Sequence, residues 1–344
     1  MSRILYGLCG VGIGHAVRGR VILEHLKKKH DVMILSSSKP YEYLKKYFDN
    51  VHKIQGFELA FKNNSIIDSI TLFRNIKKLS KFNFKEIYEL IDEFKPDLVI
   101  SDWETISSFY AKKKNIPLIS IDNQHLLISG KLNFPKKYYF DYLKAKFIIK
   151  LLMKKANYYV ITSFYENKLK KIYKNIFLVP PVLRDKILKA KTKTEDYILV
   201  YQSTNTYDEL INILKDVNDR FIVYGFDKNS EGNNLIFKKF NDEEFLDDLK
   251  NCKAVICNGG FTLISESIYL QKPLLTIPVK KHFEQLINCL HVKKMGYGEC
   301  YDNLDKGMLN KFINNLDKYK KIKIKQKNNR LIFNILNDII EGKI

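Results

Sequence analysis

Short apolar runs alternate along the chain with segments in which apolar residues recur every three or four positions. In the first half, such runs occur at residues 4–8, 32–35, 98–101, 117–121 and 158–162. Between the first two runs, Val17, Val21, Ile22 and Leu26 follow the period of an α-helix. Short apolar strands separated by helices are typical of a parallel sheet that is covered on both faces. The pattern therefore predicts an α/β fold.

A break in this alternation indicates a second domain. The charged stretch Arg184–Asp196 follows Val179-Pro180-Pro181, and apolar runs then resume at residues 197–201, 221–224, 254–257 and 274–277. We expect an N-terminal α/β domain over 1–182, a linker over 183–196 and a second α/β domain over 197–320. Residues 321–344 carry an apolar helical stripe, so we expect them to dock as a helix on the N-terminal domain.

The composition excludes a chain that is disordered throughout and favours anionic partners. Hydrophobic residues make up 45% of the 344 residues, which is enough for two cores. The 59 Lys and Arg residues exceed the 38 Asp and Glu residues and give a net charge of +21. This charge favours phosphates, an acidic membrane surface or nucleic acid, although a lysine-rich genome would produce the same excess. RNA-recognition, helix-turn-helix and zinc-finger signatures are absent from the sequence, so we expect no nucleic-acid partner.

The cysteine pattern favours a reducing compartment. Five cysteines are present, without a C-x-x-C pair and without histidines at zinc-binding spacing. The first ten residues resemble a strand that enters a glycine loop rather than a signal peptide. The sequence also lacks a run of about 18 apolar residues. We therefore expect a cytoplasmic protein without a membrane span.

The first candidate site is the glycine loop Gly10–His15, between the first strand and the first helix. Glycines allow a ligand to approach the backbone, and the helix N-terminus offers free N–H groups. The spacing departs from the dinucleotide fingerprint G-x-G-x-x-G, and Ser36-Ser37-Ser38 follows the second strand where that fingerprint has an acidic residue. We take His15 as a candidate general base. The alternative is a surface histidine in a tight turn.

Asp102 is the candidate partner of His15. It follows the apolar run 98–101, at the end of a strand where parallel sheets place their ligands. A carboxylate there can orient His15 and stabilise its imidazolium. Two alternatives are a metal site formed with Glu104 and an Asp102 that caps the following helix. We expect no metal, because the sequence supplies no further ligands nearby.

The strongest candidate site lies in the second half. Gly259-Gly260 stands between a predicted strand and a helix, where backbone N–H groups can face a diphosphate. Glu266 lies one turn further and can accept hydrogen bonds from a ribose diol. After the next strand and Pro278, Glu284-Gln285 begins another helix, with a carboxylate and an amide that suit the hydroxyls of a hexose. As isolated charges, these residues would more often belong to solvated helix faces.

Over residues 241–298 this order of motifs resembles GT-B glycosyltransferases, the group that includes the lipid II-forming GlcNAc transferase MurG and the UDP-glucuronosyltransferases. The resemblance implies two Rossmann-like parallel-sheet domains that face a central cleft. It also implies a nucleotide diphosphate sugar as donor, with UDP as the favoured nucleotide and no metal or other cofactor. The first loop lacks the longer glycine run of that group and the long plant-type signature is absent, so the acceptor is not carried over.

The resemblance also implies a role for each motif residue. Glu266 would bind the ribose, the glycine loop and Thr262 the diphosphate, Glu284 and Gln285 the sugar, and the backbone near Asn241 the base. His15 and Asp102 would correspond to the His and Asp that form the catalytic pair in plant members of this group. Gln124 and His125, after the run 117–121, are candidate acceptor contacts, and His125 is the next candidate base. The expected donor site comprises Gly14, Ser203, Thr204, Phe240, Asn241, Asn258, Gly259, Gly260, Thr262, Glu266, Glu284 and Gln285.

A basic segment completes the candidates. Lys131–Lys155 contains eight lysines and a single acidic residue, Asp141, interleaved with aromatic and aliphatic residues. This pattern is typical of a helix on an anionic membrane surface, or of a packed helix with a solvated lysine face. Together the motifs predict an inverting hexosyltransferase, peripheral on the inner face of the membrane, that acts on a lipid-linked or cell-envelope glycan. The alternatives are a UDP-GlcNAc 2-epimerase of the same architecture and a basic nucleic-acid-binding protein.

Overall fold

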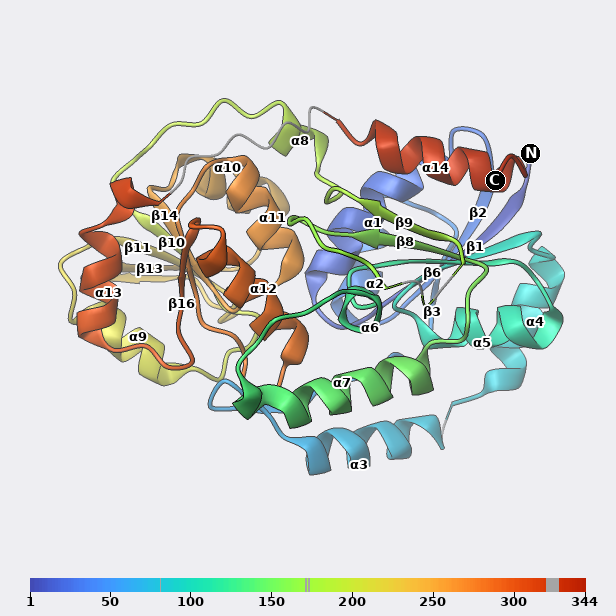
Figure 1. The fold of residues 1–344 in the computed structure, drawn as a ribbon, viewed down its shortest axis with the longest axis horizontal. Helices are drawn as coiled ribbons and strands as arrows, with labels where there is room; N and C mark the ends of the chain where they lie inside the picture. The colour runs from blue at the N-terminus through green and yellow to red at the C-terminus, as the bar shows by residue number, and fades with distance from the viewer. Residues whose placement is uncertain (81, 171, 173, 320–327) are drawn as a thin grey trace. The chain divides into compact units, whose positions relative to one another are not determined.

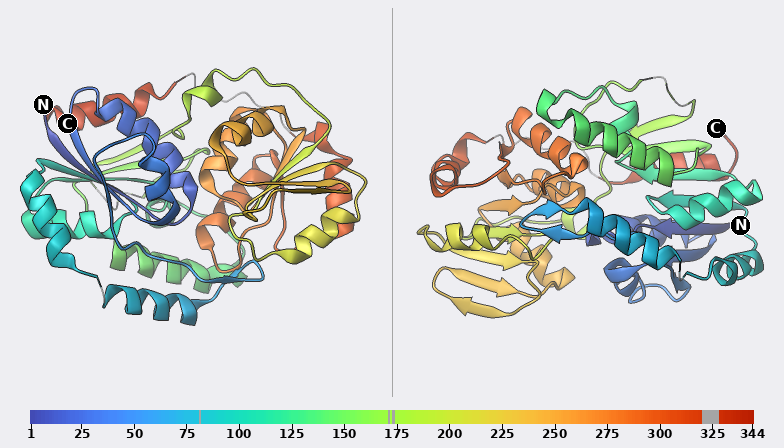
Figure 2. Two further views of the ribbon diagram at one scale, coloured as in Figure 1. Left: turned by 180° about the vertical axis from the view of Figure 1, so that it is seen from behind. Right: turned by 90° about the horizontal axis from the view of Figure 1, so that it is seen from below.

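The computed structural model describes residues 1–80, 82–170, 172, 174–319 and 328–344. The chain divides into two compact units, which Figures 1 and 2 show as ribbons. Unit 1 comprises Met1–Leu59, Asp68–Arg184 and Asn328–Ile344, and unit 2 comprises Ala60–Ile67 and Asp185–Lys327.

Unit 1 is built on a parallel sheet with the strand order β3-β2-β1-β6-β7-β8-β9. Its central strands are buried almost throughout, as their apolar runs predict. The strands are β1 (Arg3–Leu8), β2 (Asp31–Ser36), β3 (Val51–Lys53), β6 (Leu98–Asp102), β7 (Leu118–Asp122), β8 (Tyr158–Thr162) and β9 (Ile176–Val179).

Helices cover both faces of this sheet (Figure 1). Ile4 and Tyr6 share a core with α1, α2 and α14 on one face. On the other face α5 packs so closely that a Cβ at Gly7 would come within 2.0 Å of Ser107 Oγ. The helices of unit 1 are α1 (Ile13–Leu26), α2 (Ser38–Leu44), α3 (Asp68–Leu79), α4 (Phe84–Phe94), α5 (Thr105–Lys114), α6 (Leu126–Ser129), the 3₁₀ helix η1 (Lys136–Tyr138), α7 (Tyr139–Leu152) and α14 (Arg330–Ile340).

The C-terminal helix α14 belongs to unit 1. Ile332, Leu336 and Ile339 lie in the same core as the first strand. Phe333 stacks on His25 of α1 with ring centroids 4.1 Å apart. The apolar stripe seen in the sequence is therefore the packed face of this helix. Residues 320–327, which belong to the predicted domain end and tail segment, lie outside the described residues.

Unit 2 repeats the architecture with the order β12-β13-β11-β10-β14-β15-β16, parallel except for the β12–β13 edge pair. Its strands are β10 (Ile198–Tyr201), β11 (Phe221–Tyr224), β12 (Ser230–Gly232), β13 (Leu235–Lys238), β14 (Ala254–Cys257), β15 (Leu274–Thr276) and β16 (Gly298–Cys300). Its helices are α8 (Asp185–Leu188), α9 (Asp208–Lys215), α10 (Asp242–Asn251), α11 (Phe261–Tyr269), α12 (Phe283–Lys294), α13 (Lys306–Ile313) and the 3₁₀ helix η2 (Leu316–Lys318).

The units differ from the expected domains in two places. The hairpin of β4 (Phe61–Lys62) and β5 (Ser65–Ile66) lies within the predicted N-terminal domain but belongs to unit 2. The expected linker 183–196 contains α8, and Ile187 in that helix is only 1% exposed. Leu183 and Ile187 are buried, whereas residues 191–196 are exposed, so α8 packs within unit 2 and the end of the stretch runs over its surface.

Each sheet has a point at which the strand order reverses. In unit 1, β1 lies between β2 and β6, and in unit 2, β10 lies between β11 and β14. Open α/β sheets bind ligands beyond the carboxyl ends of the strands at such a point. Leu8, the last residue of β1, lies opposite Asp102, the last residue of β6. Tyr201, at the end of β10, lies opposite Cys257 at the end of β14.

Candidate active site

His15 and Asp102 meet at the carboxyl edge of the unit 1 sheet. Gly12, with a φ of 78°, turns the chain from β1 into α1, and His15 lies in the first turn of that helix. Its Nδ1 lies 2.7 Å from Asp102 Oδ1. The proximity required by the sequence argument is therefore present in the structure, while the catalytic role of the pair stays a prediction.

The hydrogen bonds indicate which nitrogen of His15 carries the proton. The charges of Arg18 and His15 lower the pKa of Asp102, although complete burial on its own would raise it. An ionised Asp102 can only accept, so in the neutral imidazole Nδ1 is the nitrogen that donates and Nε2 is the one with the lone pair. Because Nδ1 is then a donor, it cannot accept from Arg18 Nη2, which lies 2.9 Å away. Nη2 donates to Asp102 Oδ1 instead. A lone pair on Nε2 is what a general base requires.

Arg18 is a site residue that the sequence reasoning missed. Its side chain is 2% exposed, and Nε donates to Asp102 Oδ2 over 3.0 Å while Nη2 donates to Oδ1. Its Nη1 donates to Asn123 Oδ1 over 3.2 Å. The available signal was spacing, because residues three apart share one face of a helix and Arg18 follows His15 by three. The positive charge of the Arg18 guanidinium compensates the buried negative charge of Asp102.

Glu104, the other half of the possible metal motif, has a structural role. Its Oε1 accepts from the Ile106 N–H and its Oε2 from the Ser107 N–H, each over 2.7 Å. It thereby caps α5, so the cap expected as an alternative for Asp102 is made by Glu104 instead. Burial raises the pKa of Glu104. Among the residues that the structure describes, no three His, Cys, Asp or Glu side chains are grouped to hold a metal ion.

The two candidate acceptor residues differ in their surroundings. Gln124 Nε2 lies 3.4 Å from His15 Nε2, which places this amide beside the lone pair of the candidate base. His125 is 3% exposed, and its Nδ1 lies 2.7 Å from Asp122 Oδ2. Burial would raise the pKa of Asp122, but His125 and neighbouring hydrogen bonds lower it to about 2. The structure thus brings Gln124 to His15 and buries His125 in a separate pair.

In unit 2, the glycine loop follows β14. Gly259 has a φ of 105°, and a Cβ there would come within 2.5 Å of Cys289 Sγ. Gly260 is exposed and stands at the N-cap of α11, where it offers no side chain to cap the helix. A Cβ at Gly260 would meet nothing within 4 Å. The space around Gly260 could therefore admit an anion at the start of α11, where backbone N–H groups and the helix dipole favour negative charge.

The predicted ribose and sugar residues lie on the two helices after β14 and β15. Thr262 is half-buried in the first turn of α11, and Glu266 in the same helix is 1% exposed. Glu284 is half-buried at the start of α12. The Gln285 Oε1 accepts from the Val279 N–H over 3.0 Å, so this amide also holds the loop after β15.

The remaining donor candidates occupy two other loops. Asn241 caps α10 by accepting from the N–H groups of Glu243 and Glu244, so only its backbone suits a base. Phe240 packs against Phe245 with ring centroids 5.4 Å apart. The loop after β10 begins with Gln202 and carries Ser203 and Thr204, and Thr204 Oγ1 lies 3.1 Å from Thr206 Oγ1. The Gln202 carboxamide is fully buried and has no hydrogen-bond partner among the described residues.

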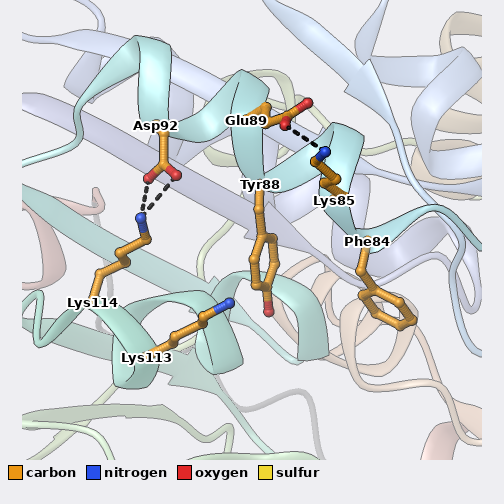
Figure 3. Close-up of a pocket in the computed structure, with 7 residues that line it drawn as sticks. All are labelled: Phe84, Lys85, Tyr88, Glu89, Asp92, Lys113 and Lys114. Carbon is orange, nitrogen blue, oxygen red and sulfur yellow. Dashed lines mark hydrogen bonds and ion pairs between the residues drawn. The ribbon is translucent and has the colours of Figure 1, made fainter.

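A pocket on α4 and α5 is separate from these residues. Phe84, Tyr88, Lys113 and other side chains line it, with the ion pairs Lys114–Asp92 and Lys85–Glu89 at its sides (Figure 3). None of the predicted site residues lies in this pocket.

Comparisons with known proteins show the family of this chain and relatives of its fold. The model of the family described as "Glycosyl transferase family 1" matches residues 2–317. An "Uncharacterized glycosyltransferase" from Methanosarcina acetivorans is 23% identical over 327 residues, covering 86% of this chain and 83% of the relative. The fold resembles MurG of Acinetobacter baumannii, with a TM-score of 0.61, 12% identity and coverage of 98% of this chain and 100% of that one. It also resembles a UDP-glucosyltransferase from Polygonum tinctorium, with a TM-score of 0.64, 12% identity and coverage of 93% and 90%.

Proposed function

Because the chain belongs to glycosyl transferase family 1, we propose that it is an inverting hexosyltransferase that uses a nucleotide diphosphate sugar, with UDP as the nucleotide. Its fold is GT-B, and it is a glycosyltransferase. The observation that carries the inverting mechanism is the contact between His15 and the buried carboxylate of Asp102. The UDP-glucosyltransferase among the similar structures supports the choice of nucleotide.

In this proposal, His15 Nε2 takes the proton of the acceptor hydroxyl. The acceptor oxygen attacks the anomeric carbon from the face opposite the diphosphate, and the bond from that carbon to the diphosphate oxygen breaks. Asp102 holds Nδ1–H and stabilises the imidazolium that forms. The negative charge on the departing nucleotide diphosphate is met by the open N-terminus of α11. No metal is required in this scheme, because helix N–H groups stabilise the leaving group.

The donor contacts follow from the loops at the carboxyl edge of the unit 2 sheet. We assign the diphosphate to Gly260 and Thr262, the ribose to Glu266, and the hexose hydroxyls to Glu284 and Gln285. The sheet topology supports this assignment, because β10, β14 and β15 are neighbouring strands and the loops that follow them lie at the same edge of the sheet. The backbone of residues 240–241, before α10, is assigned to the base.

Replacing Glu266 with alanine should weaken the binding of both UDP and the UDP-sugar by about 1.5–3 kcal/mol, the value of hydrogen bonds to a charged group. Glu284→Ala should weaken only the UDP-sugar, because its carboxylate faces the hexose. Isothermal titration calorimetry with a panel of nucleotides and nucleotide sugars measures both effects.

Since Glu266 is only 1% exposed, its loss also needs a control for folding. Glu266→Gln keeps the shape and one acceptor, so it should lose less UDP affinity than alanine. Melting curves without ligand show whether either variant is unfolded. A folded Glu266→Ala protein with wild-type affinity for UDP would remove the ribose assignment.

We further propose that the exposed faces of α3 and α7 rest on an anionic membrane surface. The two helices are joined by the Lys144–Asp68 ion pair and lie side by side in Figures 1 and 2. Exposed apolar side chains gather on both, namely Ile70, Leu72, Phe73 and Ile76 on α3 and Tyr139, Phe140, Leu143, Phe147 and Leu151 on α7. A cytoplasmic enzyme held in this way could act on a lipid-linked or cell-envelope glycan.

Charge and apolar surface together support this proposal. The most exposed of these side chains, Phe140, is 82% exposed, and lysines of Lys131–Lys155 flank it. Amphipathic helices with basic flanks bind interfaces through buried apolar area and attraction to anionic lipids. Among the described residues, no helix is both long enough and apolar enough to span a bilayer.

Vesicles that contain anionic lipid should therefore sediment the protein, and high salt should release it, because salt screens the attraction. The double variant Phe140→Ser and Phe147→Ser should bind at least roughly tenfold more weakly, since each buried aromatic side chain contributes about 1.5–3 kcal/mol. Met308→Ser, which removes an exposed apolar side chain from unit 2, is the matched control and should bind normally. Equal sedimentation with neutral vesicles would contradict the proposal.

A further inference from the structure

The hairpin of residues 60–67 comes from the N-terminal half of the sequence but is built into unit 2. Its turn residues Asn63 and Asn64 have φ values of 47° and 52°, as a tight two-residue hairpin turn requires. The hairpin pairs with the loop after β15. The Ile66 N–H donates to the Lys280 carbonyl over 3.2 Å, and the Lys280 N–H donates to the Asn64 carbonyl over 2.8 Å.

Asn64 contacts all three loops of the proposed donor site. It is 1% exposed. Its Oδ1 accepts from Asn258 Nδ2 over 3.1 Å, and its Nδ2 donates to the Pro278 carbonyl over 3.4 Å. Its backbone N–H donates to Thr206 Oγ1 over 3.4 Å. These partners lie after β14, β15 and β10, so a single side chain and its backbone connect the carboxyl ends of three neighbouring strands.

The orientation of Asn258 shows what Asn64 holds in place. The Ser203 N–H donates to Asn258 over 2.7 Å, and an N–H can donate only to the amide oxygen, Oδ1. Nδ2 of Asn258 must then face the Ile277 carbonyl, 3.3 Å away, and Asn64 Oδ1. Asn258 immediately precedes Gly259-Gly260. The chain of contacts from Asn64 through Asn258 to Ser203 therefore fixes the glycine loop against the loop after β10.

From this network we infer that Asn64 is a positioning residue of the donor site. The inference rests on the proposed function, because it places the diphosphate at the glycine loop. Asn64 touches no substrate in this scheme. It holds Asn258, and through it the open end of α11, in the arrangement that receives the diphosphate. Preorganised loops bind more tightly because the cost of ordering them is met in folding.

The test is Asn64→Gly, because glycine adopts a φ of 52° freely and loses only the carboxamide. Asn63→Gly is the matched control, since Asn63 is exposed in the same turn with a φ of 47°. Asn64→Gly should raise the Kd for UDP and the KM for the UDP-sugar by about tenfold or more, the scale of one lost buried hydrogen bond. Its kcat at saturating donor should change by less than about threefold, because the residue acts on binding. Asn63→Gly should match the wild type.

A second variant separates positioning from simple folding. Asn64→Asp tolerates the turn conformation. Burial raises the pKa of its carboxyl, and the neutral acid keeps an acceptor for Asn258 Nδ2 and a donor for the Pro278 carbonyl, so it should retain most of the donor affinity and serves if the glycine variant melts too low. Donor affinity in Asn64→Gly equal to that of the wild type, or an equal loss in Asn64→Asp and Asn64→Gly, would overturn the inference. A wild-type protein that binds no nucleotide sugar at all would instead remove the proposed function.

Discussion

Replacing His15 with alanine should lower kcat by about 10²–10⁴-fold, the usual contribution of a positioned general base. The donor Kd should stay within about twofold of the wild type, because the residues assigned to the diphosphate, ribose and hexose belong to unit 2, and only Gly14 of the expected donor site lies in unit 1. Steady-state kinetics at saturating donor, together with calorimetry for UDP, separate the two quantities. A His15→Ala enzyme with wild-type kcat would show that another group takes the acceptor proton.

Asp102→Asn is the companion variant to His15→Ala. Its amide oxygen can still accept from His15 Nδ1, 2.7 Å away in the wild type, but it carries no charge to stabilise the imidazolium. The variant should therefore lose activity, though less than His15→Ala, because the base itself remains. If Asp102→Asn were as active as the wild type, the carboxylate would have only a structural role.

Replacing Arg18 with methionine should destabilise the fold by about 3–5 kcal/mol, because it leaves the buried Asp102 carboxylate without its compensating charge. Arg18 is 2% exposed, and Asp102 is fully buried. Urea denaturation at pH 7 measures the loss. Removing both charges in Arg18→Met with Asp102→Asn should recover much of the stability, since no uncompensated charge then remains.

The pH dependence of this loss has a definite sign. In the wild type the pKa of Asp102 is lowered, so the group contributes stability above its unfolded pKa of about 3.9, and this contribution is lost as the pH falls through the folded pKa. In Arg18→Met burial dominates and raises the pKa of Asp102, so the variant loses stability as the pH rises above about 4. The stability difference between wild type and variant should therefore shrink as the pH is lowered toward 4.

Arg20→Met in the same helix is the matched control for Arg18→Met. Arg20 pairs with Glu24 at the surface, with 27% of its side chain exposed. An exposed pair is worth about 0–1 kcal/mol and the stacking of Arg20 on Tyr47 about 0.5–1 kcal/mol, so the control should lose less than about 2 kcal/mol, well below the loss in Arg18→Met. A loss of similar size in both variants would show that the Arg18–Asp102 contact is not the cause.

Apolar periodicity predicted the elements that are buried on both faces or strongly amphipathic. The helical period of Val17, Val21, Ile22 and Leu26 belongs to α1, and the runs at 98–101 and 254–257 are the central strands β6 and β14. The meeting of His15 and Asp102 followed from one rule, that parallel strands end at the same edge of a sheet. The sequence alone was therefore enough to predict which residues meet at the carboxyl edge of the unit 1 sheet.

Other features depend on contacts that local sequence does not encode. β3 and β16 lack an apolar run, because β3 ends in His52-Lys53 and β16 begins with Gly298-Glu299. The sequence of residues 60–67 does not show that this hairpin belongs to unit 2. Its pairing with Lys280 does. The buried position of Arg18 likewise results from a partner that lies 84 residues further along the chain.

The stereochemistry of slow donor hydrolysis tests the central claim, an inverting transfer with His15 as base, without knowledge of the acceptor. Water can replace the acceptor hydroxyl, and proton NMR can record the released sugar before its anomers equilibrate. With a UDP-α-hexose that calorimetry shows to bind, the account predicts that the β anomer appears first and that its release slows in His15→Ala. Release of the α anomer first, at a rate that His15→Ala leaves unchanged, would contradict it.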